Sequence, residues 1–371
     1  MKNKCLIFNN YEFRKTDGGP SGFLAQNFSC SAGEYFELGN KKDSYPLNSR
    51  AGLNSIALKL KLKLNVVLNH LDKKHYAEQI RSSRISFAYN KAKEYRAVWF
   101  HDIFQCYACL DLIKPDQIVI LQSHSPQLVS EEVYDYSGNK LIAEWVKQAE
   151  IAAFNRANYL VFPNAGVTEL YEKIIKDESK LIYLPSGCEK KSKQIPIPLD
   201  EKFTYFLYIG RRNKIKGYDV LIEAFDEACK VRKDIKLIVA GQGDKSSKND
   251  SIIDIGYTNN PHLWLSTCDY LINANRQSYF DLSVMEALSM GTPLILTCSH
   301  GHTFFKNQHS KGITEVIANN AASLTSAIIK SKLKKDNNIE GSLQNVQLFD
   351  QNFTSDLYLA RIENFLSNVL S

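Results

Sequence analysis

The chain has no long hydrophobic run. Although 44% of its 371 residues are hydrophobic, no stretch approaches the roughly 18 apolar residues that a membrane-spanning helix needs. The N-terminal apolar run extends only from Cys5 to Phe8, which is too short for a secretory signal peptide. These absences predict a cytoplasmic protein, with peripheral contact at the inner face of a membrane as a second option.

Metal-binding patterns are also missing. The eight cysteines are scattered, and the close pair of Cys106 and Cys109 has no second Cys or His pair at zinc-site spacing. No acidic cluster such as Asp-x-Asp stands in a turn suited to Mg²⁺ or Mn²⁺. We therefore expect no metal site and no bound cofactor. In a cytoplasmic chain the cysteines are expected to be reduced.

Short apolar segments instead alternate with helical ones along the chain. Strands are expected at 5–10, 97–100, 117–121, 159–162, 180–184, 203–209, 235–240, 270–273 and 293–297, and helices at about 140–155, 218–230 and 282–290. A polar, proline-bearing stretch at 189–202 is typical of a linker. Alternation on both sides of a linker predicts an α/β fold with two doubly wound parallel sheets, whose ligands bind at the carboxyl ends of the strands.

The overall charge is mildly basic, with a formal net charge of +6. This charge suits a diphosphate-bearing substrate or an anionic membrane surface, and it does not call for nucleic acid. Lysines concentrate at positions 59, 61, 63, 73 and 74. Residues 58–64 alternate Leu and Lys as a strand would, within a stretch that is otherwise helical in character. A membrane contact and a solvated face both stay open for these lysines.

The clearest chemical signal is the segment from Gly210 to Gly217, which follows an expected strand and contains Arg211 and Lys216. Glycine lets the backbone come close to a ligand. Arginine presents a planar fork to phosphate oxygens, and lysine presents a mobile point charge. Two such cations in one loop can hold a diphosphate leaving group. A basic surface turn is the alternative.

A second signal is the segment from Asp281 to Pro293, which predicts a helix that starts near Asp281 and stops at Gly291. The N-terminus of a helix attracts anions through its free N–H groups and its dipole. Glu286 lies in the second turn, where its carboxylate can accept hydrogen bonds from two ribose hydroxyls. A glutamate that faces solvent is the alternative.

Together these segments resemble the donor-binding domain of GT-B glycosyltransferases of family 4, the glycosyl transferases of group 1. The family pattern appears here as Gly210-Arg211, Lys216-Gly217, Glu286-Ala287 and Gly291-Thr292-Pro293, with Gly241-Gln242-Gly243 between them. The clear resemblance covers about residues 203–300. It implies donor binding by Arg211, Lys216, Gly243, Ser278, Leu282, Ser283 and Glu286, and a catalytic role for Arg211 and Lys216.

The resemblance implies a GT-B fold, in which two Rossmann-like domains face a central cleft. We expect an N-terminal acceptor-binding domain at 1–195 and a C-terminal nucleotide-sugar-binding domain at 196–345. A C-terminal helix at 346–371 is expected to cross back to the N-terminal domain.

The N-terminal half resembles the family more loosely. Gly18 and Gly19 occupy the place of the glycine loop after the first strand, which implies a donor contact. His101 is similar to the catalytic histidine near the donor sugar, and His124 to a histidine beside the acceptor. A histidine that follows a strand is otherwise usually a packed or solvated residue.

One position departs from the family pattern. The usual Glu-x7-Glu pair is incomplete, because Ser278 stands where the first glutamate belongs. The glycine pair around Phe280 is also replaced, by Tyr279 and Asp281. Asp281 either caps the helix or stands in for the missing acid as a catalytic group near the donor sugar.

The resemblance implies a hexosyltransferase-type enzyme that retains anomeric configuration. Its donor is expected to be a UDP- or GDP-sugar, and its acceptor a glycan or lipid-linked glycan of bacterial surface polysaccharide or lipopolysaccharide synthesis. Two alternatives stay open. One is a sugar-nucleotide epimerase, which shares the fold, and the other is a non-catalytic homologue that only binds nucleotide.

Overall fold

The protein is described here by a computed structural model, which covers residues 1–8, 10, 19–28, 32–39, 72–243, 249–331, 334 and 337–371. Its contacts divide the chain into two compact units. The first unit comprises Met1–Phe162, Leu170–Leu184 and Leu359–Ser371, and the second comprises Pro163–Glu169 and Pro185–Tyr358. The domain limits expected from the sequence stay a prediction. The Leu/Lys segment 58–64 lies outside the described residues.

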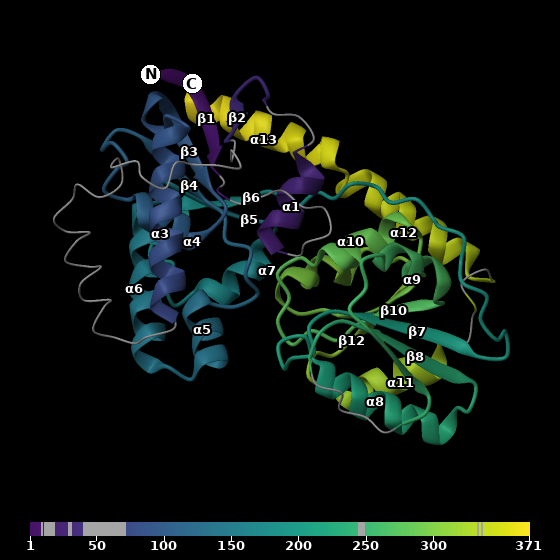
Figure 1. The fold of residues 1–371 in the computed structure, drawn as a ribbon. Helices are drawn as coiled ribbons and strands as arrows, with labels where there is room; N and C mark the ends of the chain where they lie inside the picture. The colour runs from purple at the N-terminus through teal and green to yellow at the C-terminus, as the bar shows by residue number, and fades with distance from the viewer. Residues whose placement is uncertain are drawn as a thin grey trace. The chain divides into compact units, whose positions relative to one another are not determined.

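The first unit contains a parallel six-stranded sheet in the order β2-β1-β3-β4-β5-β6 (Figure 1). Its strands are β1 (Lys2–Phe8), β2 (Phe36–Leu38), β3 (Tyr95–Phe100), β4 (Ile118–Leu121), β5 (Tyr159–Phe162) and β6 (Leu181–Tyr183). Its helices are α1 (Gly19–Asn27), α3 (Asp72–Tyr89), α4 (Ile103–Cys109), α5 (Val129–Ser137), α6 (Lys140–Arg156) and most of α13 (Ser355–Leu370).

Helices cover both faces of this sheet. On one face, the aromatic rings of Tyr76, Phe104 and Trp145 pack together and join α3, α4 and α6. On the other face, Phe365 of α13 packs edge-on against Trp99 of β3 and Tyr159 of β5. Strands covered on both faces must be apolar throughout, which explains their continuous runs of aliphatic and aromatic residues.

The second unit contains another parallel six-stranded sheet, in the order β12-β11-β10-β7-β8-β9. Its strands are β7 (Thr204–Ile209), β8 (Ile235–Ala240), β9 (Ile252–Gly256), β10 (Tyr270–Asn273), β11 (Leu294–Thr297) and β12 (Ile313–Val316). Its helices are α7 (Ala165–Thr168), α8 (Tyr218–Val231), α9 (Pro261–Thr267), α10 (Leu282–Ser289), α11 (Ala321–Lys330) and α12 (Ile339–Asn352), with a 3-10 helix, η5, at His300–Asn307.

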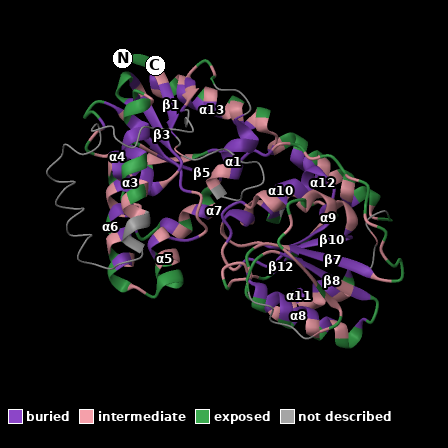
Figure 2. Cartoon of the chain, viewed as in Figure 1, coloured by how far each residue is buried: buried purple, intermediate pink, exposed green. Residues whose placement is uncertain are grey.

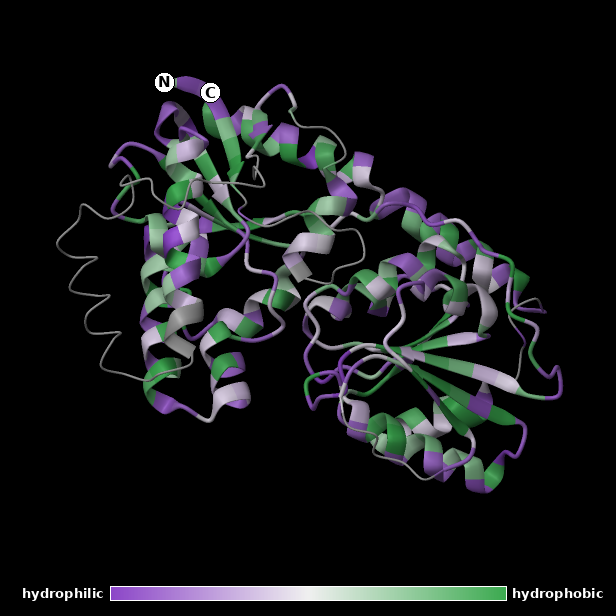
Figure 3. Cartoon of the chain, viewed as in Figure 1, coloured by the Kyte–Doolittle hydropathy of each residue, from purple (hydrophilic) through white to green (hydrophobic). Residues whose placement is uncertain are grey.

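Within this unit, α8 and α11 lie on one face of the sheet, and α9, α10 and α12 lie on the other (Figure 1). Phe206, Leu237 and Phe225 belong to the core between the sheet and α8. Figure 2 shows the central strands of each unit as buried, and Figure 3 shows that they are predominantly hydrophobic. The expected α/β fold with two parallel sheets is therefore confirmed.

Candidate active site

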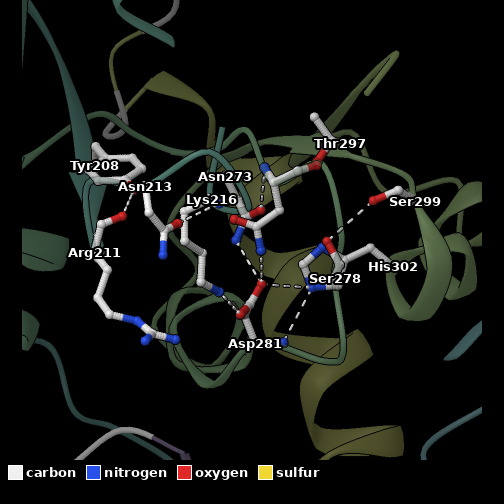
Figure 4. Close-up of polar contacts among 11 residues, drawn as sticks. Tyr208, Arg211, Asn213, Lys216, Asn273, Ser278, Asp281, Thr297, Ser299 and His302 are labelled. Atoms are coloured by element: carbon white, nitrogen blue, oxygen red, sulfur yellow. Dashed lines mark hydrogen bonds and ion pairs between the residues drawn. The ribbon is translucent and has the colours of Figure 1, made fainter. Parts of the chain in front are cut away.

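The loop of residues 210–217, here called the basic loop, joins β7 to α8 at the carboxyl edge of the sheet. Gly217 is the N-cap of α8 and has a left-handed backbone (φ 62°, ψ 25°). The Tyr208 hydroxyl donates to the Arg211 carbonyl at 2.6 Å, and the Asn213 side chain accepts from the Lys216 amide at 2.9 Å (Figure 4). These contacts fix the backbone on either side of the two expected cations.

The basic loop contains two adjacent arginines with different surroundings. The Arg212 guanidinium is held by both oxygens of Asp254, at 2.9 and 2.5 Å, and it donates to the Gly243 carbonyl at 3.2 Å. Gly243 therefore lies directly against the basic loop. Arg211 is exposed, and its side chain extends to the same side of the loop as that of Lys216 (Figure 4). Binding of the donor by Arg211 stays a prediction.

Lys216 contacts Asp281, one of the residues at which this chain departs from the family pattern that it resembles. Its Nζ lies 2.5 Å from Oδ1 of Asp281. The other oxygen, Oδ2, accepts from Asn275 Nδ2 at 2.5 Å and Asn273 Nδ2 at 3.1 Å, and it lies 3.4 Å from His302 Nε2. We call these five residues the carboxylate cluster (Figure 4). It joins the basic loop, the end of β10, the start of α10 and η5.

The electrostatics of the cluster favour an ionised Asp281. Burial alone raises the pKa of this carboxyl group, but the positive charge of Lys216 and the hydrogen bonds outweigh burial and lower the pKa to about 2. His302 is fully buried, which lowers its pKa to about 4 despite the nearby carboxylate. His302 is therefore neutral at pH 7. Its Nε2 accepts a hydrogen bond from the Asp281 amide at 3.3 Å, which leaves the ring proton on Nδ1.

The structure distinguishes between the two roles considered for Asp281 at the start of α10. Its backbone carbonyl accepts from the amides of Val284 and Met285, but its side chain makes no capping hydrogen bond to the described helix. Helix capping by the carboxylate is therefore wrong, since its oxygens serve the carboxylate cluster. A contact with the donor sugar stays a prediction. Leu282 and Ser283, the first residues of α10, are half-buried.

Ser278, the other departure, has no exposed surface, and its hydroxyl lies 3.4 Å from that of Ser299. Its carbonyl accepts from the Gly301 amide at 2.9 Å, which ties the segment before α10 to η5. A direct contact between Ser278 and the donor stays a prediction. Glu286 is buried rather than solvent-facing, and its carboxylate lies 3.4 Å from His262 Nε2 on α9.

In the first unit, the structure brings His101 and His124 together. They follow the neighbouring strands β3 and β4, and His101 Nδ1 lies 2.9 Å from His124 Nε2. Burial lowers the pKa of His101 well below its ordinary value and that of His124 to about 3, so both rings are neutral at pH 7. The His101 ring also stacks on Trp99 at 5.6 Å. The proposed contacts with the donor sugar and the acceptor stay predictions.

The expected glycine loop after the first strand lies at the edge of what the structure describes. Gly18 lies outside the described residues, and Gly19 begins α1. Cys106 and Cys109 are buried on α4, as free thiols. In the described part of the chain, no group of three His, Cys, Asp or Glu side chains is arranged to hold a metal ion. The described helices include none that is long and apolar enough to cross a membrane.

The buried neutral His302 predicts a loss of stability in mild acid. Its folded pKa, about 4, lies below the ordinary value of 6.5. The unfolded chain therefore binds the proton more readily, and the unfolding free energy falls as pH drops from 6.5 towards 4. Between pH 7 and pH 5 this group should cost about 2 kcal/mol. Urea unfolding at both pH values measures the effect.

Two variants separate this contribution from those of other groups. His302→Gln should reduce the pH dependence of the unfolding free energy by that amount, whatever its effect on stability at pH 7. His309→Gln replaces an exposed histidine of the same unit and should retain the wild-type dependence. Equal pH dependence in all three proteins would contradict the assignment.

Comparisons with known proteins agree with the class of protein that the fold and the basic loop indicate. Residues 204–331 match the family described as "Glycosyl transferases group 1". An uncharacterised glycosyltransferase of Methanocaldococcus jannaschii is 21% identical over 260 residues, which cover 57% of this chain and 64% of that protein. The chain thus spans slightly less than two thirds of this relative's length.

Two solved structures share the fold. Sucrose-phosphate synthase from Thermosynechococcus elongatus has a TM-score of 0.71 at 13% identity, covering 98% of both chains. Anabaena HepE in complex with UDP and glucose has a TM-score of 0.63 at 12% identity, covering 98% of this chain and 99% of that one. The chain therefore has the GT-B fold, and the segment that matches the group 1 glycosyl transferases lies in its second unit.

Proposed function

We propose that this protein transfers a sugar from a nucleoside diphosphate donor to a glycan or glycolipid acceptor, without a catalytic metal and with retention of configuration. The observation that carries the proposal is the pair of cations, Arg211 and Lys216, on the basic loop of a group 1 glycosyl transferase domain. Lys216 is fixed beside the start of α10, where helix N–H groups favour an anion.

The residues suit departure of a diphosphate. Cleavage of the donor builds negative charge on the leaving diphosphate and positive charge on the sugar. Cations and N–H groups fixed in advance stabilise that negative charge, and one such donor typically contributes about 2.7 to 4 kcal/mol in the transition state. Arg211 and Lys216 supply this stabilisation in the proposed mechanism. Glu286, buried next to His262, is proposed to accept from the ribose hydroxyls.

UDP- and GDP-sugars are the proposed donors, and the UDP complex of the structurally similar HepE supports the first. A screen of nucleotide sugars for thermal stabilisation and for hydrolysis tests the proposal. Stabilisation by at least one nucleotide sugar is expected, with release of its nucleoside diphosphate. Conversion of the donor to its epimer without an acceptor would favour an epimerase. Binding without turnover in any acceptor mixture would favour a non-catalytic homologue.

The acceptor is proposed to belong to bacterial surface polysaccharide or lipopolysaccharide synthesis, from the sequence resemblance. Peripheral contact with the inner face of a membrane belongs to this proposal. Co-sedimentation with anionic vesicles at low salt tests the membrane contact. Absence of binding under these conditions would refute the proposed contact.

Activity is expected to persist in excess EDTA. The reason is that Arg211 and Lys216 supply the positive charge that a divalent ion provides in metal-dependent transferases. The initial rate should change less than twofold on chelation, measured with the donor that the screen identifies. Complete loss of activity, restored by added Mn²⁺, would contradict the proposed leaving-group chemistry. A metal-dependent glycosyltransferase assayed in the same buffer controls for the chelator.

A further inference from the structure

Asp281 places a negative charge against the lysine that is proposed to hold the leaving diphosphate. The distance of 2.5 Å between Lys216 Nζ and Asp281 Oδ1 is that of a direct ion pair. The family pattern has glycine at this position, so the carboxylate is a feature of this chain. A diphosphate that approaches Lys216 must therefore also approach a carboxylate.

The carboxylate is anchored independently of Lys216. Asn273 and Asn275, at the carboxyl end of β10, hold its Oδ2 oxygen, and His302 lies 3.4 Å from the same oxygen. The two asparagines come from the sheet edge, so their hydrogen bonds keep Asp281 in place when the long Lys216 side chain moves. Both oxygens already have partners, which argues for a role in this cluster rather than at the sugar.

Lys216 keeps the capacity to bind a ligand while paired. An ammonium group has three N–H donors, and the contact with Asp281 Oδ1 uses one of them. About a fifth of the Lys216 side chain is solvent-accessible. The pair as a whole is neutral, however, so it attracts a diphosphate less strongly than an isolated ammonium does.

We propose that Asp281 is a positioning and charge-balancing residue for Lys216. It holds the ammonium group where the phosphates bind. It also lowers the affinity of the second unit for the nucleoside diphosphate product, so that the product is released. This inference rests on the proposed function only in requiring that the second unit binds a nucleoside diphosphate.

The test is isothermal titration calorimetry of the full chain with UDP and GDP, and with uridine and guanosine. Asp281→Asn removes the charge but keeps the shape of the side chain. It should bind the nucleoside diphosphate at least about tenfold more tightly than the wild type, because a negative charge close to the phosphates is lost. Affinity for the nucleoside should stay unchanged, since a nucleoside carries no phosphate.

Further variants make the result specific. Asp281→Gly restores the residue of the family pattern, and it should also bind the diphosphate more tightly than the wild type. It replaces Asp281→Asn in the titration if that variant fails to fold. Glu223→Gln removes one negative charge from an exposed position on α8 and should leave both affinities unchanged. In Asp281→Asn, the inhibition constant of the nucleoside diphosphate as a product should fall by the same factor as its Kd.

The outcomes distinguish the inference from the proposed function. Unchanged or weaker diphosphate binding in Asp281→Asn and Asp281→Gly, with a wild type that binds, overturns the inference alone. Equal tightening of nucleoside and diphosphate also overturns it, because a general structural change then explains the effect. A wild type that binds neither diphosphate overturns the proposed function together with the inference.

Discussion

Replacing Lys216 with alanine is expected to lower kcat/KM for the nucleotide sugar by about two to three orders of magnitude. The ammonium group is fixed beside the start of α10 by Asp281, and a preorganised charge of this kind contributes about 2.7 to 4 kcal/mol to the transition state. Arg211→Ala should act in the same direction, because Arg211 is exposed on the same side of the basic loop. Steady-state kinetics with the donor identified by the screen measure both effects.

The basic loop offers a matched control. Lys214 has the same charge as Lys216, is exposed, and lies two residues away. Its backbone carbonyl accepts from Arg276 at 2.6 Å, a contact that a side-chain truncation leaves in place. Lys214→Ala should therefore retain nearly wild-type kcat/KM. Near wild-type rates in both Lys216→Ala and Arg211→Ala would contradict the proposal that the basic loop binds the diphosphate.

Replacing Lys216 with alanine also removes the cation that pairs with Asp281. Truncation leaves the Asp281 carboxylate half-buried without its cation, which destabilises the domain. A second variant, Lys216→Ala with Asp281→Asn, removes the unpaired charge along with the lysine. If the lysine acts on the diphosphate, the double variant should regain melting temperature but not turnover. Recovery of both would mean that the loss came from the buried charge.

The sequence predicted the basic loop and α10 because their chemistry is local. A strand, a glycine, the two cations and a second glycine all fall within residues 204–217, and the backbone of the loop brings Arg211 and Lys216 to one side. His302, Asn275 and His262 were missed. Each is a single polar residue without a motif, and its contact with Asp281 or Glu286 depends on which strands and helices are neighbours in the folded unit.

The order of strands in the sheet also explains why His101 and His124 meet in the first unit. Residues that follow adjacent parallel strands meet at one edge of the sheet, so pairing of β3 with β4 brings His101 and His124 together. The sequence indicated both residues, but not that they share a hydrogen bond of 2.9 Å. Strand order and side-chain rotamers set that contact, and neither is encoded in a local pattern.

The strands that the sequence analysis did not single out are those with polar or exposed residues. β9 and β12 lie at the two edges of the second sheet, and both carry charged residues and exposed positions. An edge strand is paired on one side only and tolerates such residues. The central strands of this sheet, β7, β8, β10 and β11, are almost entirely buried and apolar, and each was expected from its hydrophobic run.

Gly217→Ala is expected to lower the unfolding free energy by at least about 3 kcal/mol and to reduce turnover more than tenfold. Gly217 has φ +62°, a conformation that costs an alanine about 1 to 2 kcal/mol. A Cβ at this position would also stand 1.9 Å from the Ala274 carbonyl oxygen, so the backbone must shift. Displacement there moves Lys216 on one side and Asn275 on the other, which disrupts the carboxylate cluster.

Gly138→Ala is the control that isolates this clash. Gly138 has the same φ of +62°, but a Cβ there would meet no described atom within 4 Å. It should therefore cost only the conformational penalty of about 1 to 2 kcal/mol and leave turnover unchanged. Urea unfolding and steady-state kinetics of both variants give the comparison. If Gly217→Ala were no more destabilised than Gly138→Ala, or kept its turnover, close packing of the basic loop on β10 would not be what positions Lys216.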